Sequence, residues 1–436
     1  MSITTDTTRV AEDRINFRPI QTDEPEWIYR LRKNAWEKYL ELPLPDRVQN
    51  IWRYTAPESF LAKNIDALMN LYPVVPDGGN GKPYPVTPEY AAIGYNLDNR
   101  MTVTKLTPET SAKGVVFKDI YTALRENEGF AGRFLGKLVG TSFGKFEALN
   151  LALWNTGFFL YIPDNTVIEK PILMNRHPGG QFTMGRLLVV VGRNSEVTVI
   201  DDYAGECRLE DPSANSVVEI FVGDSSRVRY VNLQRLSSKC TSYITQRGQV
   251  ETGGSLYSIF GAMGGSLSKV NAGTILNGKG ADSRMYGVLF GDEARHFDYH
   301  TMHHHKASES FSNIDFKVIL KDKANSAYTG LIRIEKETAN CEAYQENRNL
   351  LLNKGTRAES IPELEILADQ VRCTHGATMG PIDPEMLFYL ESRGVARSEA
   401  VKMIVGGFVE PTISQIPSDL QPLLRNLVLD KLGSGL

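Results

Sequence analysis

Cysteine is scarce in this chain of 436 residues. The four cysteines, Cys207, Cys240, Cys341 and Cys373, are far apart in the sequence, and none belongs to a Cys-x-x-Cys pair. Disulfide frameworks and self-contained zinc ribbons depend on characteristic cysteine spacings, so the sequence argues against both. We expect the thiols to be reduced.

The chain also lacks an excess of either charge and any long apolar run. It has 48 basic and 52 acidic side chains, a net charge of -4 and 42% hydrophobic residues, which is typical of a globular protein. Without a basic excess, nucleic acid is not an expected partner. No apolar run approaches the roughly 18 residues that cross a bilayer, and residues 1–20 resemble no targeting segment. We therefore expect a cytosolic protein with no membrane partner.

Sequence motifs of common enzymes are missing as well. There is no Gly-x-Ser-x-Gly elbow, zincin helix or kinase signature, so no nucleophile or general base can be named for a hydrolase or transferase. Glycines cluster at 253–254 and 261–265, but no Gly-Lys-Ser/Thr follows them, and turns between strands explain them better than a phosphate loop.

The length is sufficient for about three domains, and the first, residues 1–155, is predicted to be helical. Apolar residues recur at helical spacing from 28 to 39, and a second helix is expected from 60 to 68. Residues 73–88 hold five prolines and three glycines, which predict a mobile surface loop. Helical spacing returns between 121 and 154.

The central region, residues 156–370, is rich in short strands separated by Gly, Asn, Asp and Ser, with no helical segment between them. We favour a β-solenoid, because the strands come at short, nearly regular intervals. A sandwich with Greek-key turns fits the periodicity nearly as well, so the pattern alone leaves both open. The expected strands are 158–162, 186–191, 196–200, 217–222, 227–232, 242–247, 255–261, 269–276, 284–290, 316–320 and 331–334.

The last region, residues 371–436, is predicted to be mainly helical. Asp383 followed by Pro384 is a typical helix start, and Gly394 is a typical stop. A second helix is expected from Ser398 to Gly406, and a third carries leucines from 420 to 432 after the capping-box pattern at 418–421. These apolar faces are expected to pack on the chain's own core, with another protein as the alternative.

The strongest candidate for chemistry is Cys373 with His375. If the segment is extended, the two side chains project from one face and can reach one metal ion. Zinc and iron-sulfur clusters usually take four ligands, so this pair must borrow the others from elsewhere in the chain or from a partner. A purely structural role for both residues is the alternative.

Four histidines, His300, His303, His304 and His305, lie within six positions. In a strand His303 and His305 would share a face, and zinc or iron binding is conceivable. No acidic or cysteine ligand accompanies them, so we expect exposed polar turn residues instead.

The sequence after Gln345 resembles the SufB/SufD family of iron-sulfur cluster assembly proteins. The segments that carry the resemblance are 346–352 (ENRNLLL), 360–366 (SIPELEI), 373–378 (CTHGAT), 387–390 (LFYL) and 392–394 (SRG), with 157–163, 169–171 and 328–330 upstream. The motif Trp52-Arg53-Tyr54-Thr55 resembles the N-terminal motif of the family's SufD branch. The likeness therefore spans most of the chain.

This resemblance implies a right-handed parallel β-helix between N-terminal and C-terminal helical domains. It also implies a scaffold subunit, not an enzyme, that pairs with a SufB-like paralogue and binds a SufC-like ABC ATPase through its C-terminal helices. SufB-type chains carry a cluster-building cysteine and a glutamate where this chain has Asn347 and Gly376. His375 remains, as in the SufD branch, where this histidine is implicated in a transient iron-sulfur cluster at the SufB interface, with Cys373 as a second candidate ligand.

Two alternatives accompany this hypothesis. A β-solenoid is also the fold of many carbohydrate-active enzymes, but these are expected to carry a secretion signal and an acidic metal cleft. A homodimer joined through uncapped β-helix edges keeps the same pathway but changes the assembly.

Overall fold

The computed structural model describes residues 17, 24–62, 65, 89–97, 101–126, 128–177, 182–205 and 212–433. The loop expected at 73–88, most of the helix expected at 60–68 and Cys207 lie outside these residues. No helix among the described residues is both long and apolar enough to cross a bilayer.

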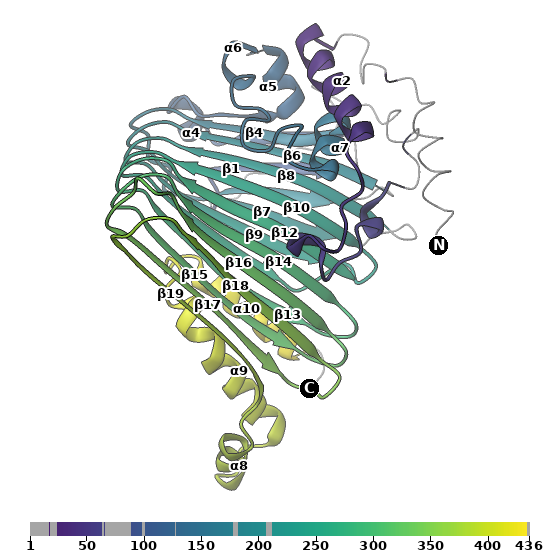
Figure 1. Ribbon diagram of the computed structural model, residues 1–436, viewed down its shortest axis with the longest axis vertical. Helices are drawn as coiled ribbons and strands as arrows, with labels where there is room; N and C mark the ends of the chain where they lie inside the picture. The colour runs from purple at the N-terminus through teal and green to yellow at the C-terminus, as the bar shows by residue number, and fades with distance from the viewer. Residues whose placement is uncertain are drawn as a thin grey trace.

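The centre of the molecule is a parallel β-solenoid of about seven turns. From β4 onward successive strands alternate between two sheets, so that each coil contributes one strand to each (Figure 1). Parallel pairing between coils excludes the Greek-key sandwich, whose sheets are antiparallel. One sheet has the order β19-β17-β15-β13-β11-β9-β7-β5-β1-β2 and the other β18-β16-β14-β12-β10-β8-β6-β4-β3. The strands are β1 (Ala92–Leu97), β2 (Met101–Leu106), β3 (Val116–Asp119), β4 (Thr156–Ile162), β5 (Ile172–His177), β6 (Phe182–Val191), β7 (Glu196–Gly205), β8 (Ser213–Val222), β9 (Arg227–Leu236), β10 (Thr241–Val250), β11 (Ser255–Ala262), β12 (Leu267–Leu276), β13 (Asp282–Gly291), β14 (His296–His305), β15 (Phe311–Leu320), β16 (Asn325–Ile334), β17 (Cys341–Leu351), β18 (Arg357–Ile366) and β19 (Val371–Pro381).

The coils stack in register, with small variations in coil length. Thr241 lies opposite Leu267 and Asn325 lies opposite Arg357, offsets of 26 and 32 residues. Side chains alternate along each strand, so one set of every strand fills the space between the two sheets. Phe316 contacts Tyr328 there, with ring centroids 5.2 Å apart. The interior is thus a packed core rather than a channel.

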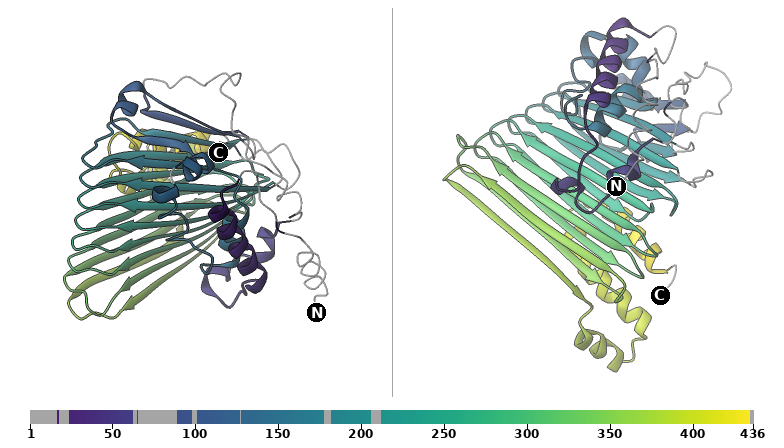
Figure 2. Two further views of the ribbon diagram at one scale, coloured as in Figure 1. Left: turned by 90° about the horizontal axis from the view of Figure 1, so that it is seen from above. Right: turned by 45° about the vertical axis from the view of Figure 1, so that its right-hand side comes forward.

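The first coils are covered by helices on the outer face of the nine-stranded sheet (Figure 2). Buried Arg32 of α2 donates hydrogen bonds to the carbonyl oxygens of Ala152 and Trp154, both at 3.0 Å. These bonds link α2 to the C-terminal end of α7. The region 1–155 is not wholly helical as expected, since β1, β2 and β3 pair with the solenoid and extend its sheets. The helical elements are α2 (Glu26–Glu41), η1 (Asn50–Trp52), η2 (Pro57–Phe60), α4 (Pro108–Ala112), α5 (Ile120–Glu126), α6 (Glu128–Ala131) and α7 (Lys145–Leu153).

The segment containing η1 and η2 runs along the outside of the same sheet. Trp52 packs on Tyr243 of β10, with ring centroids 5.5 Å apart. Asp298 of β14 accepts hydrogen bonds from Thr55 and from Lys269, whose Nζ lies 2.7 Å from its Oδ2. Asn50 donates to Glu363 of β18, so the segment reaches from the middle coils to the last one.

Three helices follow the solenoid: α8 (Pro384–Ser392), α9 (Arg397–Ile413) and α10 (Gln421–Gly433). The Asp383 side chain caps α8 by accepting from the Glu385 N–H at 2.9 Å, and Gly394 has φ +83°, as the sequence predicts. The region 371–436 begins with a strand, β19, because residues 371–381 pair in register with β17.

The helix expected to end at Gly406 continues to Ile413. Glycine weakens a helix by about 1 kcal/mol, but burial of Val405, Val409 and Ile413 against the solenoid outweighs that cost. Together α9 and α10 cover the outer face of the ten-stranded sheet, where they pack against Val231, Ile259 and Val288. By contrast, α8 projects from the end of the stack (Figure 1). The apolar faces of α9 and α10 therefore pack on the chain's own core.

Candidate functional site

Cys373 and His375 lie on β19, the terminal strand of the ten-stranded sheet. One edge of β19 pairs with β17, and within the described residues no strand pairs with its other edge. The same holds for β18 in the opposite sheet. The pair therefore occupies the last coil, at the open end of the solenoid (Figure 2).

The register with β17 shows which way the two side chains face. Cys373 lies opposite Ala343, and His375 lies opposite Gln345. Ala343 and Gln345 are buried, with 0% and 4% of their surface exposed, and belong to the set that points between the sheets. Because stacked parallel strands keep the same facing, Cys373 and His375 also point to the interior side. The expectation that they share a face is confirmed.

Facing inward does not bury this pair fully, because no further coil covers it. His375 is exposed, and Cys373 is half-buried against a small apolar cluster that includes Cys341. Burial, and then the neighbouring Cys341, raise the pKa of the Cys373 thiol to about 11. At neutral pH this thiol is protonated, so a metal ion would have to displace the proton to gain a thiolate ligand.

Two further polar side chains point into this end of the solenoid, and sequence reasoning did not select them. They are Gln345 of β17 and Ser360 of β18; Gln345 Oε1 and Ser360 Oγ are buried and have no hydrogen-bond partner among the described residues. The coil period could have revealed Gln345 from the sequence. This residue precedes His375 by 30 positions, the length of one coil, and therefore lies opposite it in the register of β17 and β19.

The chemistry available at this end is that of an incomplete ligand set. Imidazole and thiol are ligands for iron and zinc. Among the described residues, however, no group of three or more His, Cys, Asp or Glu side chains could hold a metal ion. Two ligands on an open coil can bind a metal centre only if another molecule completes it.

The expectation for the histidine group is wrong. His300, His303, His304 and His305 lie in β14 between β12 and β16, not in an exposed turn. His300, His303 and His305 are buried, and His304 is half-buried. His303 and His305 share the interior face, as alternation predicts, and both are 0% exposed.

Each imidazole of this group has a hydrogen-bond partner. His303 Nε2 lies 2.9 Å from Ser283 Oγ, and His305 contacts two serine hydroxyls at 2.7 and 2.8 Å. Burial lowers the pKa of His305 to about 4, so its ring is neutral at pH 7. These contacts explain His303 and His305 as core residues, while His300 and His304, on the opposite face of β14, pair with Asp298 and Glu335.

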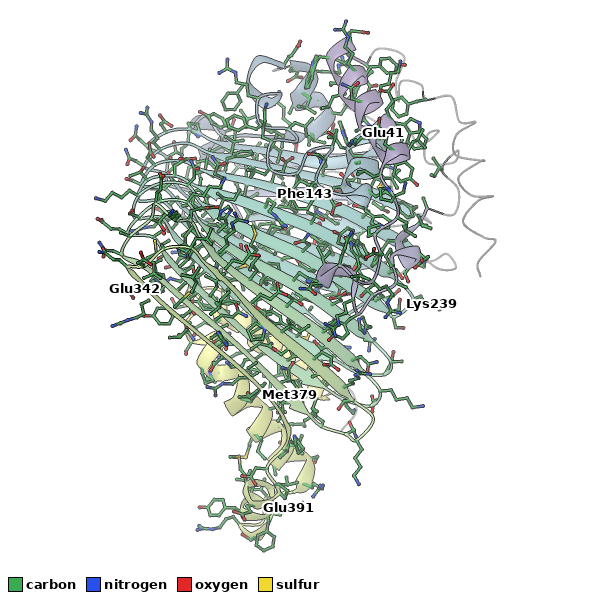
Figure 3. All side chains as sticks on the ribbon, viewed as in Figure 1. Glu41, Phe143, Lys239, Glu342, Met379 and Glu391 are labelled. Carbon is green, nitrogen blue, oxygen red and sulfur yellow. The ribbon has the colours of Figure 1, made fainter. Side chains whose placement is uncertain are left out.

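Exposed apolar side chains gather where the chain leaves the solenoid. Met386, Phe388 and Tyr389 of α8 are 50%, 71% and 56% exposed, and Met403 of α9 is 57% exposed. Met379, labelled in Figure 3, lies on the stretch of β19 that leads to α8 and is 50% exposed. Exposed apolar patches are typical of surfaces that bind other proteins, so this part of the chain is a candidate for such a surface.

Comparison with known proteins gives one consistent result. Residues 173–408 match the family described as the SufBD core domain of SUF-system FeS cluster assembly, and residues 15–174 match the SufBD N-terminal region. Iron-sulfur cluster assembly SufBD family proteins of Staphylococcus saprophyticus and Staphylococcus haemolyticus are each 26% identical to this chain over 418 residues. The alignments cover 93% of this chain and 89% of each relative.

Proposed function

Because this chain belongs to the SufBD family of iron-sulfur cluster assembly proteins, we propose that it is a SufD-like scaffold subunit of the SUF system, without catalytic activity of its own. In this proposal His375 supplies one ligand to a nascent cluster, which is cargo and leaves when it is complete. The observation that carries the proposal is the exposed imidazole on the last, uncovered coil, where a second polypeptide can complete the ligand set.

The assignment to the SufD side of the family depends on residues that are absent. Asn347 and Gly376 stand where the SufB-type pattern has a cysteine and a glutamate. Asn347 is buried and lies opposite Ala377, and Gly376 lies on the other face from His375. An amide and a hydrogen atom cannot replace a thiolate and a carboxylate as iron ligands, so this chain would need a SufB-like partner for them.

Cys373 is the second candidate ligand, with a weaker case. Its raised pKa opposes thiolate formation in the free subunit, whereas iron bound at His375 would favour it. We infer that His375 binds first and that Cys373 joins only when a cluster is present. Few ligands from one subunit also favour release, because the finished cluster exchanges them for those of a recipient.

Two surfaces are available for partners in a cytoplasmic complex. The unpaired edges of β18 and β19 suit a SufB-like paralogue, or a second copy of this chain, because strand edges offer free N–H and C=O groups. The exposed apolar residues of α8 suit the SufC-like ATPase, whose ATP hydrolysis would reshape the subunit interface. The apolar faces of α9 and α10 that pack on the solenoid are not available for this contact.

The test is anaerobic reconstitution with a SufB-like chain and the ATPase, measuring iron and sulfide retained per complex. We expect His375→Ala to reduce the yield roughly tenfold, the scale on which metal sites respond to altered ligation, and Cys373→Ser to reduce it less. Thr374→Ala is the matched control, because Thr374 is exposed on the same strand and faces the other way. An unchanged yield with His375→Ala would remove the proposed role of this residue.

A further inference from the structure

A cavity of about 360 Å³ lies between α10 and the turns of the middle coils, away from the last coil. Its walls come from the end of β9, the turn after β11, the turn before β14 and the C-terminal half of α10. The turn after β9, which carries Lys239 at the rim of the stack in Figure 3, forms one side. This volume is many times the roughly 30 Å³ that a water molecule occupies in the liquid, and it falls within the range of small-molecule sites.

One side of the cavity is apolar. Leu236 and Met263 are 2% and 4% exposed, and Leu427 of α10 is half-buried beside them. These side chains provide a surface on which a flat or aliphatic group would lose contact with water.

The opposite side presents hydrogen-bond donors that have no partner among the residues the structure describes. The Arg295 side chain is only 8% exposed, and its Nε atom is buried without a hydrogen bond in the described part of the chain. The rest of this guanidinium contacts Asp292 and Glu293. Ser237 Oγ is also buried and has no hydrogen-bond partner within the described ranges. Buried donors without acceptors destabilise a fold, so two of them beside one cavity point to a ligand that accepts hydrogen bonds.

Three side chains that line the cavity are cationic, and each of them is paired with a carboxylate. Lys431 pairs with Asp292 at 3.0 Å, and burial, followed by the charge of Arg295, lowers the pKa of Lys431 to about 8. Arg235 adds a third cation and is paired with Asp202. Asp430 is the one carboxylate in the lining, and it disfavours an anion that approaches its side of the cavity.

We propose that this cavity binds a small organic oxyanion, a phosphate or carboxylate attached to an apolar group. Arg295 Nε and Ser237 Oγ donate to the oxygen atoms, Lys431 supplies charge, and Leu236 and Met263 contact the apolar part. The site is independent of the cluster ligands on β19, and the inference does not depend on the role proposed for His375.

Calorimetric titration of the full-length chain tests this, with phenyl phosphate, benzoate and inorganic phosphate as probes. We expect saturable binding of phenyl phosphate or benzoate, and the tighter of the two identifies the oxyanion. Ser237→Ala removes one hydrogen bond to a charged group and should weaken that binding about tenfold, and Lys431→Gln should weaken it comparably. Arg425→Gln is the matched control, because Arg425 also lies on α10 but pairs with Glu410 outside the cavity. The Arg425→Gln variant should bind the probe with the same affinity as the wild type.

Thermal unfolding separates specific binding from general salt effects. Phosphate stabilises many proteins by exclusion from their surface, so a stabilisation equal in the wild type, Ser237→Ala and Lys431→Gln would overturn the proposal. The absence of saturable binding for both aromatic probes would overturn it too, as would inorganic phosphate binding as tightly as phenyl phosphate.

Discussion

Replacing Asp298 with Asn should detach the segment 50–60 from the solenoid while leaving the coils folded. Asp298 and Lys269 form an ion pair whose side chains are 1% and 0% exposed. Burial opposes ionisation of Asp298, but the hydrogen bond from His300 and the charge of Lys269 outweigh it, and its pKa lies well below the usual value. The carboxylate is therefore charged at neutral pH and holds both Lys269 and Thr55.

The expected size of the effect follows from burial. Removing one partner of a buried ion pair costs about 3–5 kcal/mol, because the other charge is left without compensation. The carbonyl oxygen of Ile51 still accepts from Lys269, so we expect the lower end, about 3 kcal/mol. That value corresponds to roughly a hundredfold increase in the open population of the segment.

Hydrogen exchange measured by mass spectrometry reports this opening directly. Exchange in peptides covering 50–60 should accelerate about a hundredfold in Asp298→Asn, while peptides from the interior strands keep their protection. Adding Lys269→Met removes the unpaired ammonium group and should restore most of the protection. Glu26→Gln is the control, because its pair with Arg30 is 70% and 72% exposed and contributes less than about 1 kcal/mol. Wild-type exchange at 50–60 in Asp298→Asn would refute the reasoning.

Three further predictions concern the other end of the chain. Leu424→Ala on α10 removes a side chain that is 1% exposed and should lower the free energy of unfolding, measured by chemical denaturation, by about 2–5 kcal/mol. Leu429 is 56% exposed on the same helix, and Leu429→Ala should change the free energy of unfolding by no more than about 0.5 kcal/mol. Equal effects of the two substitutions would contradict the packing of α10. Alkylation of Cys373, followed by peptide mass spectrometry, should accelerate about tenfold per pH unit from pH 7 towards its pKa of about 11, and a plateau near pH 9 would contradict the raised pKa. Phe388→Asp should leave the free energy of unfolding unchanged, since this ring is 71% exposed. It should weaken binding of the proposed ATPase partner at least tenfold in a pull-down titration. Undiminished binding would show that the ATPase does not bind through Phe388.

A simple local pattern predicted the strand-rich centre but left a sandwich open, and the parallel β-helix, which the structure confirms, was implied by the family resemblance. Most of the expected strands coincide with observed ones, and the shared face of Cys373 and His375 follows from alternation within one strand. Whether that face points inward depends on pairing with β17, a contact between residues 30 positions apart that local periodicity does not contain. The burial of His303 and His305 was missed for the same reason, since it depends on neighbouring coils.

Helix ends were predicted where a side chain decides them and missed where packing decides. Asp383 caps α8 by a local hydrogen bond that the sequence reveals. At Gly406 the local signal favours a stop, but an added Cβ there would meet nothing within 4 Å, so glycine is not required by the geometry. The helix continues because residues beyond it are buried on the solenoid, which only the folded chain determines.

The contact between Asn50 and Glu363 has a consequence for biosynthesis. The two residues are 313 positions apart, so at about 5–20 residues per second a ribosome completes the second one on the order of 15–60 s after the first. The early coils can stack on one another as they emerge, because each needs only its predecessor. Trp52 and Thr55 can dock once β10 and β14 have stacked, because they contact Tyr243 and Asp298. The Asn50–Glu363 contact must wait until β18 has been synthesised, and it would then mark a nascent chain that has reached its last coil.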